Sequence, residues 1–470
     1  MKIIQGGMGA SISNWRLAQA VSKTGELGVV SGTGLDVIMS RMLQKGDKGG
    51  FIKSALERFP NPEIAEKIYE KYFIEGGKDD NQPFINPSKY EIENDNELLE
   101  LTVVANFVEV TLAKDGHTNP IGINFLEKIQ MPLLPAIYGA MLAGVDNVFM
   151  GAGLPLQIAK ILDEFRTHNP MKYNLTVIGN NKNANIGLEF DPSLIGCTDT
   201  DLIRPDFYPI ITLPFAGKIL TKKQAPGSMQ GFIVEGYSAG GHNASPRGNP
   251  PLNAKGEPTY GPRDIPDLNE IKKFKLPFWL AGGYGTKDGL ERAIQSGAEG
   301  IQVGTLFEFC DESGLDPKLK NYILSRILEH DIQILTDAKA SPTGFPFKVA
   351  KVVETLSTSS NYRDRKRICE LGFLRTPYLG SDGKVGYRCP SEPIKSYVAK
   401  GGDPKDTIGR KCLCDALAAN AGVPQVRKDG YIEEPLITAG DSINIIKELI
   451  TKKKPHYSAQ EVIGFLLNKD

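Results

Sequence analysis

The chain has 470 residues, which suits either one barrel of about 250 residues with insertions and a tail, or two to three domains of about 100–200 residues. Its 55 Lys and Arg residues balance 56 Asp and Glu residues, and no basic block interleaved with aromatic residues occurs, which excludes the charge pattern of a nucleic-acid-binding protein. The longest apolar run, residues 131–145, contains two prolines and is too short to span a membrane.

The start of the chain lacks the apolar core of a secretory signal peptide. Six cysteines in so long a chain do not make a disulfide scaffold. We therefore expect a cytoplasmic protein with reduced thiols, whose partners are small molecules rather than nucleic acid or a membrane.

Short apolar runs that end in small residues alternate with helix-like segments from the first residues onward. The candidate strands are residues 2–5, 27–30, 121–124, 147–150, 208–213, 231–234, 278–281 and 300–303. This alternation is typical of a parallel sheet, and eight strands are the number that closes a (β/α)₈ TIM barrel. The sequence therefore predicts an α/β fold with a TIM barrel over residues 1–339, interrupted by insertions at about residues 53–101 and 171–206.

Helix signals support this arrangement. Residues 15–23 follow Ser13 and residues 287–295 follow Thr286, both of which can start a helix. Within the second insertion, residues 175–178 form a further apolar run. In an alternative assignment of the barrel strands, this run is itself a strand. From about residue 340 the alternation stops, and helix-like segments at residues 443–450 and 459–467 lie between loops rich in Gly and Pro. We expect residues 340–470 to form a mainly helical extension or lid that packs on the barrel.

Most of the predicted strands end in glycine or polar residues. These are Gly7, Met8 and Gly9 after the first strand, Asn124 at the end of the third, Glu235, Gly240 and Gly241 after the sixth, Gly282 and Gly283 after the seventh, and Gln302, Val303, Gly304 and Thr305 around the end of the eighth. In a TIM barrel these ends share one rim that binds ligands, and glycine lets the backbone approach a flat ligand closely.

The tendency of glycine to form turns explains its presence in any one of these loops. It explains less well why most of the loops on this rim contain glycine. The last two loops suit the phosphate of a flavin mononucleotide (FMN), because TIM barrels commonly hold a phosphate there. The glycines at positions 283, 285 and 289 miss the usual dinucleotide spacing by one residue, and no P-loop occurs.

His242 is the candidate catalytic residue. It follows two glycines in a loop on the ligand rim, where an imidazole can move a proton to or from a substrate. The alternative is a histidine whose hydrogen bonds only stabilise the loop.

The C-terminal part contains Cys369, Cys389, Cys412 and Cys414. Four thiols can form a zinc or iron–sulfur site, yet no C-x-x-C pair occurs among them, and unpaired thiols are ordinary inside cells. Both interpretations stay open at this point.

The same residues resemble the nitronate monooxygenase family, formerly called 2-nitropropane dioxygenases, whose neighbours include the FMN-dependent enoyl-ACP reductases. The resemblance covers roughly residues 1–309 and rests on five motifs: residues 4–9 (IQGGMG), 122–124 (GIN), 235–242 (EGYSAGGH), 281–283 (AGG) and 302–307 (QVGTLF).

The resemblance implies an FMN barrel in which the Gly7–Met8 turn and Asn124 approach the flavin ring, while Gly240, Gly283 and residues 302–305 hold the ring or the phosphate. It also implies that His242 is the base that removes the α-proton of a nitroalkane, with O₂ as the second substrate. Glu235 stands where many members have Gln, which resembles relatives linked to polyketide or polyunsaturated fatty acid synthesis.

Three functions follow as hypotheses. The first is a nitronate monooxygenase that needs no NAD(P)H. The second is an enoyl-thioester reductase that uses NAD(P)H and an acyl-carrier substrate, with His242 supplying a proton. The third is a flavin and metal electron-relay protein that docks a partner through the cysteine-bearing extension.

Overall fold

A computed structural model describes residues 1–179, 185–225 and 227–469. Its centre is an eight-stranded parallel sheet with the strand order β1-β10-β9-β8-β7-β4-β3-β2. A parallel bridge between Ile4 and Leu27 joins β1 to β2, so the sheet closes on itself as a barrel. The predicted TIM barrel is confirmed.

The barrel strands are β1 (Ile3–Gln5), β2 (Gly28–Ser31), β3 (Ile121–Leu126), β4 (Asn147–Gly151), β7 (Asp206–Ile211), β8 (Phe232–Glu235), β9 (Phe278–Ala281) and β10 (Gly300–Val303). Each lies within two residues of its predicted start and within two of its predicted end. Alternate residues point inward and fill the barrel with apolar and aromatic side chains. Tyr208, for example, stacks on Phe149 with ring centroids 5.3 Å apart and meets Trp279 edge-on.

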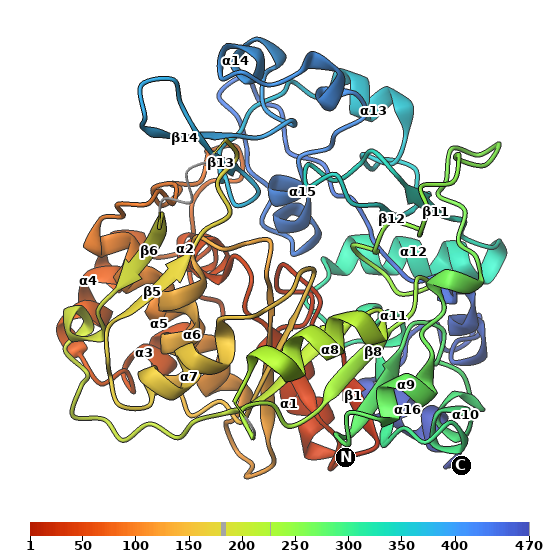
Figure 1. The fold of residues 1–470 in the computed structure, drawn as a ribbon. Coiled ribbons are helices and arrows are strands. Elements are labelled where there is room, and N and C mark those ends of the chain that lie inside the picture. The colour runs from red at the N-terminus through yellow and green to blue at the C-terminus, as the bar shows by residue number, and fades with distance from the viewer. Residues whose placement is uncertain (180–184, 226, 470) are drawn as a thin grey trace.

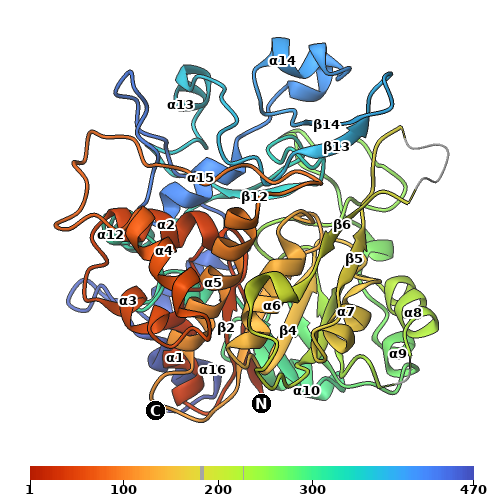
Figure 2. The same ribbon diagram turned by 90° about the vertical axis from the view of Figure 1, so that its left-hand side faces the viewer.

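Helices surround the barrel, as Figures 1 and 2 show. They are α1 (Trp15–Lys23), α2 (Leu35–Gln44), α3 (Phe51–Leu56), α4 (Pro62–Tyr72), α5 (Asn96–Ala113), α6 (Leu133–Leu142), α7 (Ile158–Phe165), α8 (Pro214–Lys223), α9 (Leu268–Lys272), α10 (Gly289–Gln295), α11 (Thr305–Glu308) and α12 (Pro317–Glu329), with the short 3₁₀ helix η2 (Pro262–Asp264) before α9. Helix α5 is apolar on nearly every face, because it packs between α1, α2 and α6.

Two predicted helix starts need correction. Asn14, not Ser13, caps α1, since its Oδ1 accepts a hydrogen bond from the Leu17 amide at 3.0 Å. Helix α10 begins at Gly289, two residues later than expected, and Thr286 donates instead to the Asp288 carboxylate.

The two expected insertions have defined structures. Residues 53–101 contain most of α3, all of α4 and the start of α5. Residues 171–206 contain the antiparallel hairpin of β5 (Met171–Asn174) and β6 (Gly187–Phe190), the 3₁₀ helix η1 (Pro192–Ile195) and the first residue of β7. Residues 175–178 do not join the barrel: the Ile178 amide donates instead to the Pro377 carbonyl of the C-terminal region.

We call residues 340–470 the extension. It contains α13 (Ser359–Asp364), α14 (Ile394–Ala399), η3 (Pro404–Thr407), α15 (Leu413–Asn420), η4 (Ile443–Glu448) and α16 (Ala459–Leu466). It also contains strands that its sequence did not suggest: β12 (Phe347–Ala350), which pairs with β11 (Ile334–Asp337), and the hairpin of β13 (Thr376–Leu379) and β14 (Val385–Arg388). In Figure 1 the layer of α13, α14 and the β13–β14 hairpin lies above the barrel, with α15 beneath that layer.

Candidate active site

A cavity lies at the carboxyl ends of the barrel strands and reaches under the extension. All of the site residues expected from the sequence line it: Gly7, Met8, Gly9, Asn124, Glu235, Gly240, Gly241, His242, Gly282, Gly283, Gln302, Val303, Gly304 and Thr305. The fold therefore brings these residues together at one rim. Their individual roles stay predictions.

The loop after β1 is shaped by buried polar side chains. The Ser13 hydroxyl donates to the Gly6 carbonyl and accepts from the Met8 amide at 2.8 Å, while the Gln5 amide group donates to the same hydroxyl at 2.8 Å. These bonds hold the turn against β3, where a side chain on Gly7 would place its Cβ only 2.3 Å from the Asn124 Cβ. Glycine is therefore required at this point of the rim.

The neighbouring part of the rim, after β9 and β10, presents free backbone donors. Gly282 and Gly283 adopt positive φ angles of 82° and 78°, which favour glycine. Within the described part of the chain, the amides of Gly282, Gly283, Gly304 and Thr305 donate no hydrogen bond. Backbone groups that line a cavity without a partner are suited to an anionic or polar ligand.

The loop that carries His242 is fixed by the extension. The Gly241 amide donates to the Thr438 hydroxyl at 2.8 Å, and the Lys348 amide donates to the Gly241 carbonyl at 2.9 Å. His242 itself forms an antiparallel bridge with Phe347, and the two rings meet edge to face. The loop thus acts as a short partner strand of β12.

Ser341 orients the His242 ring. Its buried Oγ lies 2.7 Å from His242 Nε2 and 2.8 Å from the Thr343 hydroxyl. His242 Nδ1 has no hydrogen-bond partner in the described chain, so it is the nitrogen left for a substrate.

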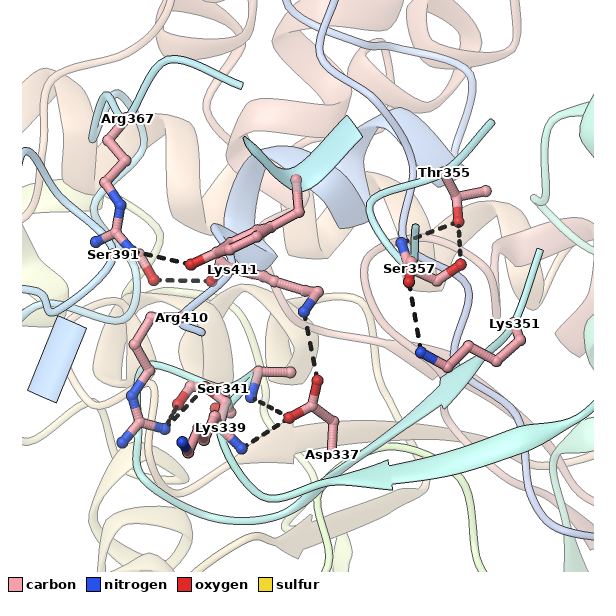
Figure 3. A network of polar contacts seen from close by, with 12 residues as sticks. Asp337, Lys339, Ser341, Lys351, Thr355, Ser357, Arg367, Ser391, Arg410 and Lys411 are labelled. Carbon is pink, nitrogen blue, oxygen red and sulfur yellow. Dashed lines mark hydrogen bonds and ion pairs between the residues drawn. The ribbon is translucent and has the colours of Figure 1, made fainter. Parts of the chain in front are cut away.

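The backbone around Ser341 is held by Arg410 of the extension and by Asp337 of β11 (Figure 3). Arg410 donates to the Lys339 and Ser341 carbonyls, the latter at 2.6 Å. The Asp337 carboxylate accepts from the backbone amides of Lys339 and Ala340 and forms an ion pair with Lys411 at 3.3 Å. This network fixes the position from which Ser341 contacts the imidazole.

Burial and a nearby charge keep His242 neutral. Burial lowers the pKa of the imidazole to about 3, and the positive charge of Lys128 acts in the same direction. Burial also lowers the pKa of Lys128 to about 7, with the neighbouring Glu127 opposing the shift. At neutral pH the imidazole is therefore uncharged.

Two carboxyl groups line the cavity without a hydrogen bond or ion pair in the described chain. Burial raises the pKa of Glu235 to about 7. It raises the pKa of Glu308 well above its usual range, and this side chain is only 4% exposed. Glu308 is thereby held as a neutral acid, and Glu235 is partly protonated near neutral pH. A protonated carboxyl group can donate a hydrogen bond to a ligand.

Several lining residues were missed by the sequence analysis. Glu308 follows the predicted rim motif directly, and its position one helical turn after Thr305 is a signal that could have found it. Ser341 and the lining residues of α15 and η4 lie in the extension, whose sequence has no strand-end pattern to indicate which residues reach the rim.

The four cysteines of the extension do lie around one small cavity. All are free thiols, and among the residues the structure describes no group of three or more His, Cys, Asp or Glu side chains is arranged to hold a metal ion. Burial raises the pKa of Cys389 to about 12, and the Cys412 thiol donates to the Asp415 carboxylate at 3.2 Å. Because the described residues contain no arrangement of metal ligands, the zinc or iron–sulfur interpretation of Cys369, Cys389, Cys412 and Cys414 is not supported.

Comparison with known proteins supports the resemblance read from the motifs. Residues 202–349 match the family model described as nitronate monooxygenase. The resemblance is confirmed for this stretch. It includes Glu235, His242 and the loops after β9 and β10. No curated protein sequence matches the chain.

Solved structures are similar to the chain along nearly its whole length. FabK from Thermotoga maritima has a TM-score of 0.50 and 15% sequence identity, with 100% of this chain and 92% of that chain covered. Nitroalkane oxidase from Streptomyces ansochromogenes has a TM-score of 0.45 and 14% identity, covering 100% and 95%. The enoyl reductase domain of MlnA from Bacillus amyloliquefaciens has a TM-score of 0.47 and 11% identity, covering 99% and 93%. At such identities the likeness to FabK supports the barrel architecture alone.

In the described ranges, every helix is too short or too polar to cross a lipid bilayer.

Proposed function

We propose that this protein is an FMN-dependent oxidoreductase that oxidises alkyl nitronates or nitroalkanes with O₂. The observation that carries the proposal is the position of His242: a neutral imidazole, anchored through Nε2 to Ser341, lies on a glycine-lined rim in the stretch that matches the nitronate monooxygenase family. FMN, when bound, supplies the redox step, and the protein supplies orientation and electrostatics.

The residues of the rim fit a flavin mononucleotide. The free amides of Gly282, Gly283, Gly304 and Thr305 suit the phosphate. Gly7, Met8 and Gly9 follow β1, the strand next to β10, and Asn124 lies on β3. Gly7, where glycine is required, lets a flat ring approach the backbone. The remaining predicted binding residues, Gly240, Gly241, Gln302 and Val303, also line the cavity.

Glu235 fits the same proposal. A neutral carboxyl group donates one hydrogen bond and accepts another, much as the glutamine found in many family members does. With its pKa raised to about 7, Glu235 keeps this proton at mildly acidic pH. It can then donate a hydrogen bond to the edge of the flavin, as glutamine would.

His242 Nδ1 has no hydrogen-bond partner in the described chain, and it is the atom through which the imidazole would take the α-proton of a nitroalkane. Enoyl-thioester reduction is the alternative function. It requires a proton donor, and the protonated carboxyl groups of Glu235 and Glu308 lie on the same cavity.

The first experiment identifies the electron donor. We expect the purified protein to carry FMN, whose absorbance bleaches anaerobically on addition of propyl nitronate. Bleaching with NADPH but not with the nitronate would instead establish the enoyl-reductase alternative.

The second experiment tests the base. We expect His242→Ala to retain FMN, to lose about 100-fold or more of kcat/KM with neutral nitropropane, and to lose far less with preformed propyl nitronate, because only the neutral substrate needs proton abstraction. His330→Ala, at the exposed end of α12, is the control and should match the wild type. Equal losses of His242→Ala on both substrates would remove the catalytic role.

A further inference from the structure

The cavity has two chemically different parts. Its barrel side carries the glycine rim, Asn124, His242 and the two carboxyl groups. Its far side, beneath the extension, is apolar: Leu371, Phe373 and Leu374 come from the loop before β13, Leu413, Leu417 and Ala418 from α15, and Ile445 from η4. The extension thus adds an apolar wall next to the reactive rim.

One face of α15 forms the middle of this wall. Cys414, Leu417 and Ala418 are three and four residues apart, which places them on the same side of the helix, and all of them line the cavity. Cys414 and Leu417 are half-buried, whereas Asp415 and Ala416 on other faces are fully buried. Leu417 therefore presents apolar surface to the cavity.

The wall is held rigidly in place. Phe373 packs on Tyr90 with ring centroids 5.9 Å apart, and Arg375 donates to the Tyr90 carbonyl at 2.6 Å. Beyond the end of α15, the buried Arg41 of α2 donates to the Val423 carbonyl at 2.7 Å. These contacts tie both apolar segments of the extension to α2 and to the chain before α5, so the wall exists before a ligand arrives.

The chemistry of the wall selects an uncharged occupant. None of the described residues that line the cavity is a lysine or an arginine, so an anionic group has no counter-ion beneath the extension. The wall also lies outside residues 202–349, the part of the chain that matches the family model.

From these observations we propose that the apolar wall binds the aliphatic chain of the substrate, and that this protein acts on long-chain alkyl nitronates or nitroalkanes rather than on short ones. The inference rests on the proposed function, because it assumes that the reacting head group lies at the His242 rim. Each methylene group that moves from water to this wall should raise kcat/KM by about three- to fourfold until the wall is filled.

The test is a chain-length series. We expect kcat/KM of the wild type to rise from propyl to decyl nitronate. Leu417→Trp should remove this rise, because the larger ring occupies the space of the chain. Leu417→Ala should flatten the series with a smaller loss. Leu194→Trp, on the 46% exposed Leu194 of η1, is the matched control.

A binding measurement separates this inference from the proposed function. Calorimetric titration with the neutral probes 1-octanol and 1-butanol needs no turnover, and octanol should bind more tightly than butanol to the wild type but not to Leu417→Trp. Suppose that the protein turns over nitronates, but that kcat/KM does not rise with chain length and octanol binds no more tightly than butanol. This result would overturn the inference and leave the proposed function in place. Octanol binding without nitronate turnover would overturn the proposed function and keep the apolar wall. Loss of FMN from both Leu417 variants would show that the wall holds the flavin and would also overturn the inference.

Discussion

The barrel mouth and the extension contribute to the same cavity, but they are built differently. The barrel side consists of eight strand ends in regular parallel register, and each turn presents backbone groups to one rim. The extension has short helices, a short β-hairpin and long loops. Side-chain contacts hold it to the preceding part of the chain, such as the ion pair between Lys411 and Asp337 in Figure 3. The comparison teaches that the barrel supplies reactive groups, while the extension orients them and closes the site.

Buried ion pairs stabilise the extension where regular secondary structure does not. Arg365 contacts Glu433 at 2.7 Å and Asp415 at 3.5 Å, and Arg427 pairs with the same glutamate. All four side chains are buried. A buried charge is costly without its partner, so this cluster makes the fold of the extension depend on single residues.

The largest expected effect tests that dependence. Glu433→Ala leaves two buried guanidinium groups without their shared carboxylate, and we expect a loss of about 3–5 kcal/mol in the free energy of unfolding. The loss should appear in urea denaturation, and limited proteolysis should cleave the extension before the barrel.

The control for this prediction is the same substitution at an exposed ion pair. Glu189 pairs with Lys172 in the β5–β6 hairpin, and its side chain is 74% exposed. Glu189→Ala should change the free energy of unfolding by about 1 kcal/mol or less. Similar losses in the two variants would show that the buried cluster does not hold the extension.

A smaller effect is expected at the barrel mouth. Gly7→Ala would place a methyl group 2.3 Å from the Asn124 Cβ, so either the turn or β3 must shift. We expect a loss of about 1–3 kcal/mol in stability together with weaker FMN retention, measured by denaturation and by flavin absorbance after gel filtration. Gly261→Ala, where an added Cβ meets no atom within 4 Å, should behave as the wild type. Unchanged flavin retention in Gly7→Ala would separate this turn from the cofactor site.

The same contrast explains how much could be predicted from the sequence. The barrel strands and the rim were predictable because strand ends, glycines and helix starts are local patterns, and the topology of a parallel barrel brings them to one side. His242 was found for this reason.

Its partner Ser341 was not, because a contact between residues 99 positions apart in an irregular segment leaves no periodic signal. The β11–β12 pair and the Arg365 cluster escaped prediction in the same way. The cysteines are a different case. Their grouping in the sequence does correspond to a grouping in space, but the described residues contain no arrangement of metal ligands that supports the zinc or iron–sulfur interpretation left open by the sequence.

The smallest expected effect sharpens the comparison at Glu235, a barrel residue that faces the shared cavity. Burial raises its pKa from 4.5 to about 7, so between these two values the folded protein keeps a proton that the unfolded chain releases. The free energy of unfolding contributed by this group therefore falls as pH rises from about 4.5 to 7 and is level above that range. The glutamine of Glu235→Gln cannot ionise, so the free energy of unfolding of this variant relative to the wild type should increase across this pH window. We expect an increase of roughly 1–2 kcal/mol, because the carboxyl group is partly exposed to the cavity and solvent there screens its charge. Urea denaturation of both proteins at equal flavin content measures the difference, and Glu189→Gln controls for the loss of an exposed charge. If the difference in free energy of unfolding between the two proteins does not depend on pH, Glu235 is ionised in the folded state across this window. The proposal that Glu235 donates a hydrogen bond to the flavin edge, as glutamine would, is then wrong.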